Sequence, residues 1–224
     1  MSMLTNLDLL RRVPMFSILT EEQTQALALA VVKRRFKRGE RIVEQGLKSN
    51  ALYIILAGRG RVIINDSKRR EVILATLQAG DYIGEMSLID NEAHSASVEA
   101  EIQTDVLELG RDEFMHCLSD SANMSYAIMC GLVHRLRIAD RKISSLALMS
   151  VYGRVAHVLL DTAAASPQQD MIIRDKLSRQ DIAKMVGASR EMVSRVMKDF
   201  VEQGFVEPLE GGAMRIKERR AQPR

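Results

Sequence analysis

Residues 177–200, LSRQDIAKMVGASREMVSRVMKDF, decide the fold of the C-terminal part of this chain. Apolar side chains recur at helical spacing on both sides of Gly187-Ala188-Ser189, as Ile182, Met185 and Val186 before it and Val193, Val196 and Met197 after it. Gly187 supplies the backbone freedom that a tight turn between helices needs, and Ser189 can cap the second helix through its hydroxyl. The segment therefore predicts a helix-turn-helix.

The second predicted helix presents side chains that suit base recognition. It opens with Arg190 and Glu191 and carries Arg195 about one turn further along the same side. The early residues of such a helix face base edges in the major groove, where Arg pairs with guanine and Glu accepts from cytosine. Basic residues outnumber acidic ones between Lys176 and Lys198, as expected of a phosphate-contacting surface. A surface helix with an ordinary salt-bridging face is the alternative.

Composition indicates a soluble, folded protein. The chain has 224 residues, 46% of them hydrophobic, and a formal net charge of +3. Its apolar runs are too short to span a bilayer, and no charged-then-apolar leader opens the chain. Two cysteines, Cys117 and Cys130, are too few for a disulfide framework. We therefore expect a cytoplasmic protein with no membrane partner.

The chain divides into three predicted stretches of an α+β fold. Short apolar runs with glycines at the breaks, over residues 40–109, are typical of an antiparallel barrel or roll. Two short helices are expected before it, in LDLLRRVPMF and EEQTQALALAVV, the second capped by Thr20. We predict a β-roll domain of jelly-roll type over 1–113, a long helix over 114–149 and a winged helix-turn-helix over 150–224.

The long helix has the spacing of a dimer seam. It contains no proline, and a set of side chains three and four residues apart has a mean period of about 3.5, as in coiled coils: Met129, Leu132, Leu136, Ala139, Ile143 and Leu146. Packing on its own domain is the alternative for this helix. Because a symmetric DNA reader presents two recognition helices, we favour a homodimer.

Two further elements complete the C-terminal domain. GRVAHVLLDTAAA, residues 153–165, predicts an amphipathic helix ahead of the helix-turn-helix. GFVEPLEGGAMRIKE, residues 204–218, alternates around Gly211-Gly212 and predicts a β-hairpin. A hairpin after the recognition helix is the wing of a winged helix.

The whole pattern resembles the cyclic AMP receptor protein (Crp/Fnr) family of bacterial transcription regulators. RQDIAKMVGASREMVSRVMK is specific to its helix-turn-helix, and GDYIGEMSLID, residues 80–90, matches the phosphate cassette of its roll. The resemblance implies that Arg190, Glu191 and Arg195 read a TGTGA-like half-site with an inverted copy, and that RNA polymerase is a partner. The further predicted DNA-binding residues are Ser178, Arg179 and Ser189 at the DNA backbone, with Gln180 and Lys198.

The resemblance also implies an effector site, which this sequence matches in part. In members that bind cyclic AMP, a Gly-Glu pair holds ribose and a downstream Arg-Ser pair holds the phosphate. Gly84 and Glu85 match the first pair, and Met86 and Ser87 continue the cassette. Downstream, EAHSAS (92–97) has Ser95 at the serine but His94 at the arginine, and a neutral imidazole lacks the guanidinium fork. Two hydroxyl residues that reach adenine in the family are replaced on the long helix by Ala139 and Asp140.

Three interpretations of the effector stay open: cyclic AMP, another cyclic nucleotide, or a vestigial pocket in a ligand-independent dimer. Cyclic di-GMP belongs to the second, because Arg137 and Asp140 form an R-x-x-D spacing and the roll carries Arg59 and Arg61. The four histidines show no metal-ligand spacing.

An enzyme is disfavoured by the motifs. The sequence has no recognisable Ser-His-Asp motif, no phosphate-gripping G-x-x-x-x-G-K-[ST] and no H-E-x-x-H. A cyclic-nucleotide-sensing interaction module without DNA readout is the alternative from another class, and the helix-turn-helix argues against it.

Overall fold

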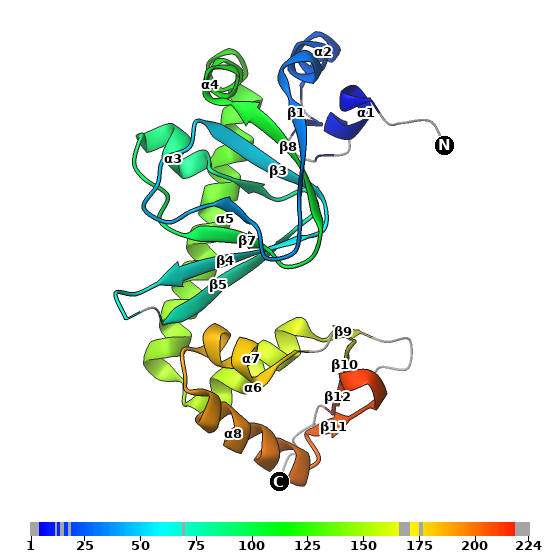
Figure 1. Ribbon diagram of the computed structural model, residues 1–224, viewed down its shortest axis with the longest axis vertical. Helices are drawn as coiled ribbons and strands as arrows, with labels where there is room; N and C mark the ends of the chain where they lie inside the picture. Colours follow the sequence, from blue (N-terminus) through cyan, green and yellow to red (C-terminus); the bar gives the residue numbers. More distant parts are fainter. Residues whose placement is uncertain are drawn as a thin grey trace. The chain divides into compact units, whose positions relative to one another are not determined.

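The computed structural model describes residues 5–11, 13, 16, 17, 19–68, 70–165, 171–174 and 177–217. The chain forms two compact units, residues 1–136 and 137–224 (Figure 1). The first unit opens with two short helices, α1 (Asn6–Leu10) and α2 (Glu21–Ala30). Each begins with a capping box, in which the hydroxyl of Thr5 or Thr20 accepts a hydrogen bond from the backbone N–H group three residues further along the chain. The predicted cap at Thr20 is confirmed.

The roll consists of two four-stranded antiparallel sheets, ordered β1-β8-β3-β6 and β2-β7-β4-β5, among the described residues of the first unit. Their strands are β1 (Val32–Phe36), β2 (Arg41–Val43), β3 (Ala51–Ala57), β4 (Arg59–Asn65), β5 (Glu71–Gln78), β6 (Tyr82–Ile83), β7 (Ser97–Ala100) and β8 (Thr104–Gly110). The predicted antiparallel roll is confirmed.

Strand β3 shows how the core of the roll is organised. Side chains alternate between the two faces of a strand, so Leu52 and Ile54 point one way while Tyr53 and Ile55 point the other. Leu52 and Ile54 enter a cluster shared with the flanking helices, whereas Tyr53 and Ile55 enter a second cluster with residues of both sheets. Because it is buried on both faces, β3 reads as a nearly continuous apolar run.

The predicted long helix is present, but its predicted start at residue 114 was wrong, because the stretch over 114–149 contains two helices. Helix α4 (Arg111–Asp120) ends before Ser121, whose backbone is extended, and helix α5 (Ala122–Leu148) starts anew. The Ser121 hydroxyl accepts a hydrogen bond from the Met124 backbone N–H at 3.2 Å, which satisfies a free donor of the new helix. The serine behind Asp120 was therefore an N-cap signal inside an otherwise helical pattern. A further short helix, α3 (Glu85–Asp90), lies in the cassette.

The second unit is a winged helix-turn-helix, as predicted. Its helices are α6 (Val151–Thr162), α7 (Arg179–Val186) and α8 (Arg190–Glu202). Its strands β9 (Ala164–Ala165), β10 (Met171–Ile173), β11 (Val206–Pro208) and β12 (Met214–Ile216) form an antiparallel sheet ordered β11-β12-β10-β9. β11 and β12 are the predicted hairpin, joined through a 3₁₀ turn (Glu210–Gly212). The described part of the chain has no helix long and apolar enough to cross a membrane.

Candidate DNA interface and effector site

The helix-turn-helix has the local geometry that its sequence predicts. Gly187 ends α7 with a φ of 63°, a left-handed conformation that glycine adopts without steric cost. Ser178 and Ser189 cap α7 and α8, since their hydroxyls accept from the backbone N–H groups of Asp181 at 3.0 Å and Met192 at 3.2 Å. Two satisfied caps and one left-handed glycine fix the turn between the helices.

Helix α8 has one buried and one exposed face. Val193, Val196 and Met197 are fully buried in the core of the second unit, which fixes the rotation of the helix. The predicted base-reading residues lie on the opposite, exposed face, as Arg190, Glu191 and Arg195. Lys198 is exposed as well and pairs with Glu202 at 3.7 Å. The arrangement brings the predicted base-reading side chains together on one solvent-facing surface.

The exposed face begins with a charged acceptor. Hydrogen bonds from its own backbone N–H and from the Ser189 hydroxyl lower the pKa of the Glu191 carboxyl. Glu191 is therefore ionised at neutral pH and can accept from an amine donor. At the start of α7, Gln180 is exposed, and Arg179 is partly buried, which lowers the pKa of its guanidinium.

Helix α5 carries an exposed apolar stripe that contains most of the residues predicted for the dimer seam. Met129, Leu136, Ile143 and Leu146 are between 49% and 64% exposed, although each is a large apolar side chain. Leu132 is partly buried and packs against the core of the roll, and Val133, 50% exposed, also lies on the stripe. The place of Leu132 in a dimer seam stays a prediction. Ala139 and Asp140 are exposed.

The cassette is built around Gly84, which has a φ of 99° at the start of α3. A Cβ at this position would lie 2.7 Å from the Ala51 carbonyl oxygen, so both the conformation and the space require glycine. The residue after it, Glu85, is 1% exposed. Further along, Met86 is 49% exposed, and the Ser87 hydroxyl donates to the Glu92 carbonyl. The sequence match to the cassette thus corresponds to a buried carboxylate behind a tight turn.

The carboxylate of Glu85 is held by an arginine that the sequence analysis did not assign to this site. Arg135 Nη1 donates to Glu85 Oε1 at 2.6 Å, and Nη2 donates to the Tyr82 carbonyl. The guanidinium also lies 4.8 Å from the centre of the Tyr82 ring. Burial raises the pKa of Glu85, and Arg135 opposes that shift. The second carboxylate oxygen, Oε2, is buried without a hydrogen-bond partner.

One sequence signal could have pointed to Arg135. Gly131, one helical turn before it, is the single glycine of α5, and a Cβ there would overlap the Tyr82 hydroxyl. The glycine leaves room beside α5 for the Tyr82 hydroxyl, and the guanidinium of Arg135 lies close to the ring of Tyr82. A lone glycine in a long helix was therefore a sign of close packing against the cassette.

His94 lies inside the roll next to the cassette. Its side chain is 8% exposed, its Nε2 shares a hydrogen bond with the Ser49 hydroxyl at 2.8 Å, and burial lowers the pKa of the imidazole. It is consequently neutral at physiological pH. Ser95, by contrast, is exposed. On β4, Arg59 and Arg61 pair with Glu101 at 3.4 and 2.8 Å, so these two arginines already have a carboxylate partner.

Comparison with known proteins decides the family. Residues 33–121 match the model of the cyclic nucleotide-binding domain, and residues 153–221 match that of the Crp-like helix-turn-helix domain. The chain is 35% identical over 182 residues to the cAMP-activated global transcriptional regulator Vfr of Pseudomonas aeruginosa, covering 78% of this chain and 84% of Vfr. It is 32% identical over 170 residues to the cAMP-activated regulator CRP of Escherichia coli, covering 74% and 80%. The chain belongs to the Crp/Fnr family of transcription regulators.

Solved structures agree with this assignment to the Crp/Fnr family. The c-di-GMP-responsive global regulator CLP of Xanthomonas campestris superposes with a TM-score of 0.77 at 25% identity, over 89% of this chain and 100% of CLP. FixK2 of Bradyrhizobium japonicum, at 22% identity and a TM-score of 0.72, over 84% of this chain and 93% of FixK2, shares the fold. As a Crp/Fnr regulator, the chain combines a cyclic nucleotide-binding domain with a helix-turn-helix DNA-binding domain, and its relatives are transcription regulators rather than enzymes.

Proposed function

We propose that this regulator acts as a homodimer paired along α5, and that its two α8 helices read TGTGA-like half-sites arranged as an inverted repeat. A cyclic nucleotide held in the roll controls the affinity for DNA, and the bound dimer contacts RNA polymerase. The exposed Arg190, Glu191 and Arg195 face of α8 carries the proposal, because those side chains are free to meet base edges while the opposite face is locked in the core.

The DNA contacts divide into two kinds. Arg190 and Arg195 each can form a bidentate pair with guanine, and the ionised Glu191 can accept from cytosine. Ser178, Arg179, Gln180, Ser189 and Lys198 are proposed to contact the DNA backbone. Fluorescence anisotropy on an inverted repeat of TGTGA and on a scrambled duplex tests this directly. Equal affinity for both duplexes would exclude sequence-specific reading by α8.

The proposed dimer uses the exposed stripe of α5. Met129, Val133, Leu136 and Ile143 follow spacings of four, three and seven residues, which is the repeat of a two-stranded coiled coil. Burying such side chains against a second copy stabilises association by about 25 cal/mol per Å² of apolar surface. Asp140 falls within the same repeat, between Leu136 and Ile143, so the seam has one charged position. A polar residue at a seam position lowers dimer stability and fixes register.

The ribose end of a cyclic nucleotide fits the cassette. Glu85 Oε2 is buried and lacks a partner, so a ribose hydroxyl donating to it would satisfy an atom that is otherwise desolvated at a cost. Vfr and CRP, named as cAMP-activated, are about one-third identical to this chain. These two observations favour a ribose-bearing cyclic nucleotide as the effector.

The phosphate end differs from what cyclic AMP requires. The neutral His94 is engaged with Ser49 inside the roll and offers no guanidinium to a phosphate. This observation counts against cyclic AMP. The second candidate is cyclic di-GMP, to which the structural relative CLP is described as responsive. Arg137 and Asp140 of α5 are the side chains that we propose for its guanine bases, because both are exposed and offer a donor and an acceptor.

Calorimetric titration of the purified dimer with cyclic AMP, cyclic GMP and cyclic di-GMP separates these candidates. Glu85→Ala should reduce the binding free energy of a ribose-bearing ligand by about 1.5–3 kcal/mol, which is the value of a charge-assisted hydrogen bond. His94→Arg should raise the affinity for cyclic AMP, because it supplies a guanidinium group to the phosphate. Tight cyclic AMP binding to the wild type, with no gain in His94→Arg, would contradict the role assigned to His94. Binding of none of the three would support a vestigial pocket.

A bound effector can alter DNA affinity only by binding one state of the dimer better than the other. Anisotropy titrations of the inverted repeat, with and without saturating nucleotide, measure that coupling. If the DNA affinity does not change, the nucleotide does not control DNA binding and the regulator works without a ligand.

A further inference from the structure

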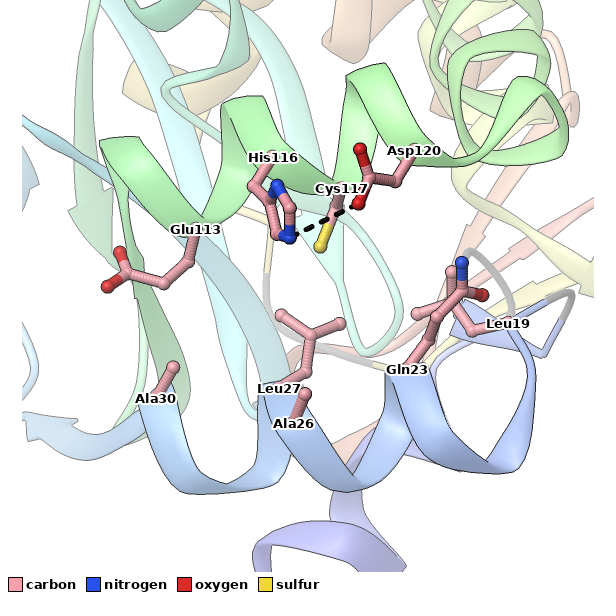
Figure 2. A pocket seen from close by; sticks show the side chains of 9 residues that line it. All are labelled: Leu19, Gln23, Ala26, Leu27, Ala30, Glu113, His116, Cys117 and Asp120. Carbon is pink, nitrogen blue, oxygen red and sulfur yellow. Dashed lines mark ion pairs between the residues drawn. The ribbon is translucent and has the colours of Figure 1, made fainter.

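A groove opens between α2 and α4, on the helical side of the roll (Figure 2). Its volume is about 140 Å³. It is lined from the α2 side by Leu19, Gln23, Ala26, Leu27 and Ala30, and from the α4 side by Glu113, His116, Cys117 and Asp120. None of these residues belongs to the proposed DNA-reading face, the cassette or the α5 stripe. The proposed function therefore leaves the groove without a role.

The groove exists because α2 presents small side chains to α4. Ala26 and Ala30 are one turn apart, and neither reaches across to the facing helix. The floor is apolar, since Leu27 is 3% exposed and belongs to the core of the roll while Cys117 packs against that core. Burial raises the pKa of the Cys117 thiol, so the floor carries no thiolate at neutral pH.

The α4 side of the groove is anionic. Glu113 and Asp120 lie two turns apart on α4, and His116 between them pairs with Asp120 at 3.2 Å (Figure 2). Asp120 also stands at the C-terminal end of the helix, where the backbone dipole adds negative potential. No lysine or arginine is among the described residues that line the groove. The lining thus combines an apolar floor with carboxylates and no fixed positive charge.

We propose that this groove docks a basic, amphipathic segment of a partner protein, which inserts one lysine or arginine side chain between α2 and α4. The volume suits one long side chain, whose methylene stem would lie on Ala26, Leu27 and Ala30. Its cationic head would reach Glu113 or Asp120. The charge of the groove repels nucleic acid, so the partner is a protein.

A synthetic helical peptide tests this with the full-length dimer. The probe is a fluorescein-labelled amphipathic peptide of lysine, leucine and alanine, and its twin has glutamate at every lysine. We expect anisotropy to report binding of the basic peptide only, and hydrogen exchange to slow in α2 and α4 on binding. Binding of the acidic twin with equal affinity, or protection confined to other elements, would overturn the proposal.

Matched variants locate the contact. Glu113→Lys should weaken the basic peptide by about fivefold or more, as expected for a charge pair replaced by repulsion. Asp112→Lys reverses a charge in the same first turn of α4 but outside the groove, so it controls for helix stability and net charge. Ala26→Trp should fill the groove and abolish binding, while circular dichroism and DNA binding confirm that the variant is folded. Equal affinity of the peptide for Glu113→Lys and Asp112→Lys, or for Ala26→Trp and the wild type, would exclude the groove.

Discussion

Replacing Arg135 with methionine should destabilise the roll by leaving the buried carboxylate of Glu85 without a partner. Methionine keeps a long apolar side chain over Tyr82 but removes the donors to Glu85 and to the Tyr82 carbonyl. Glu85 is 1% exposed, so water cannot replace the lost guanidinium. A buried charge with no counter-ion is among the most costly local changes in a protein.

The size of the effect follows from the burial of the two partners. Breaking a fully buried ion pair costs about 3–5 kcal/mol. The Arg135 side chain is 36% exposed, so water already solvates part of its charge and weakens the pair. We therefore expect a loss of about 2–3 kcal/mol in the free energy of unfolding of the roll at pH 7.5. Adding Glu85→Gln to Arg135→Met removes the stranded charge and should recover more than half of that loss.

The effect should depend on pH in a definite direction. Burial raises the pKa of Glu85, and loss of Arg135 raises it further. Protonation of Glu85 then stabilises the folded state. This contribution to the free energy of unfolding is complete below the unfolded-state pKa of about 4.3, and it is lost as pH rises through the folded-state pKa. The deficit of Arg135→Met relative to the wild type should consequently be smaller at pH 5 than at pH 7.5.

Hydrogen exchange of peptides from β3 and β8 measures the opening free energy of the roll separately from that of the second unit. This separation matters because a chain with two compact units need not unfold in one step. A deficit below about 0.5 kcal/mol at pH 7.5, or one that is the same at pH 5, would refute the claim that Arg135 neutralises a buried carboxylate.

Three further predictions address the stripe, the recognition helix and the buried histidine. Leu136→Glu should break the dimer, because two unpaired glutamates would face each other in the seam. Light scattering after size exclusion would then show a monomer. An unchanged dimer would place the interface elsewhere. Arg190→Ala and Arg195→Ala should each reduce the binding free energy for the specific duplex, and only for it, by about 1–3 kcal/mol. Arg179→Ala should instead weaken binding to all sequences, and it should reduce the slope of log affinity against log salt concentration by about one. Anisotropy at several salt concentrations distinguishes the two patterns, and equal losses on a scrambled duplex would remove Arg190 or Arg195 from base reading. Because burial lowers the pKa of His94, its contribution to stability is complete above the unfolded pKa of about 6.5 and is lost as pH falls through the folded-state pKa. His94→Gln should therefore flatten the acid side of the stability profile, measured by urea unfolding, and an unchanged profile would contradict the assignment.

The helix-turn-helix was predictable because its determinants are local. Two apolar faces, a glycine with positive φ and two serine caps lie within one short segment, and each acts on neighbours a few residues away. The same holds for the wing and for the caps of the first helices. Helix periodicity places the proposed base-reading residues opposite the apolar face, so the exposure of Arg190, Glu191 and Arg195 could be predicted from the sequence.

The helix break and the stripe were harder to predict because they depend on packing. A run of 36 residues without proline favours one helix by propensity, yet an extended Ser121 lets both Phe114 of α4 and Met124 of α5 enter the core of the roll. The 3.5-residue period fits two adjacent stripes on the same helix equally well. Which stripe faces outward is settled by the roll, which takes Leu132 and leaves Val133.

The proposed effector site shows the same limit most sharply. Sequence similarity identified Glu85 by its place in a motif, but a motif does not say which charge a buried carboxylate will meet. That charge comes from residue 135, fifty positions away, on a helix where Gly131 leaves room for the Tyr82 hydroxyl. One carboxylate oxygen of Glu85 thus accepts from Arg135 of α5, and the other is buried without a hydrogen-bond partner. A ligand donating to Oε2 would change the electrostatic environment of Arg135, on the helix that also carries the exposed stripe. The carboxylate that would recognise the effector is therefore also a physical link from the cassette to α5.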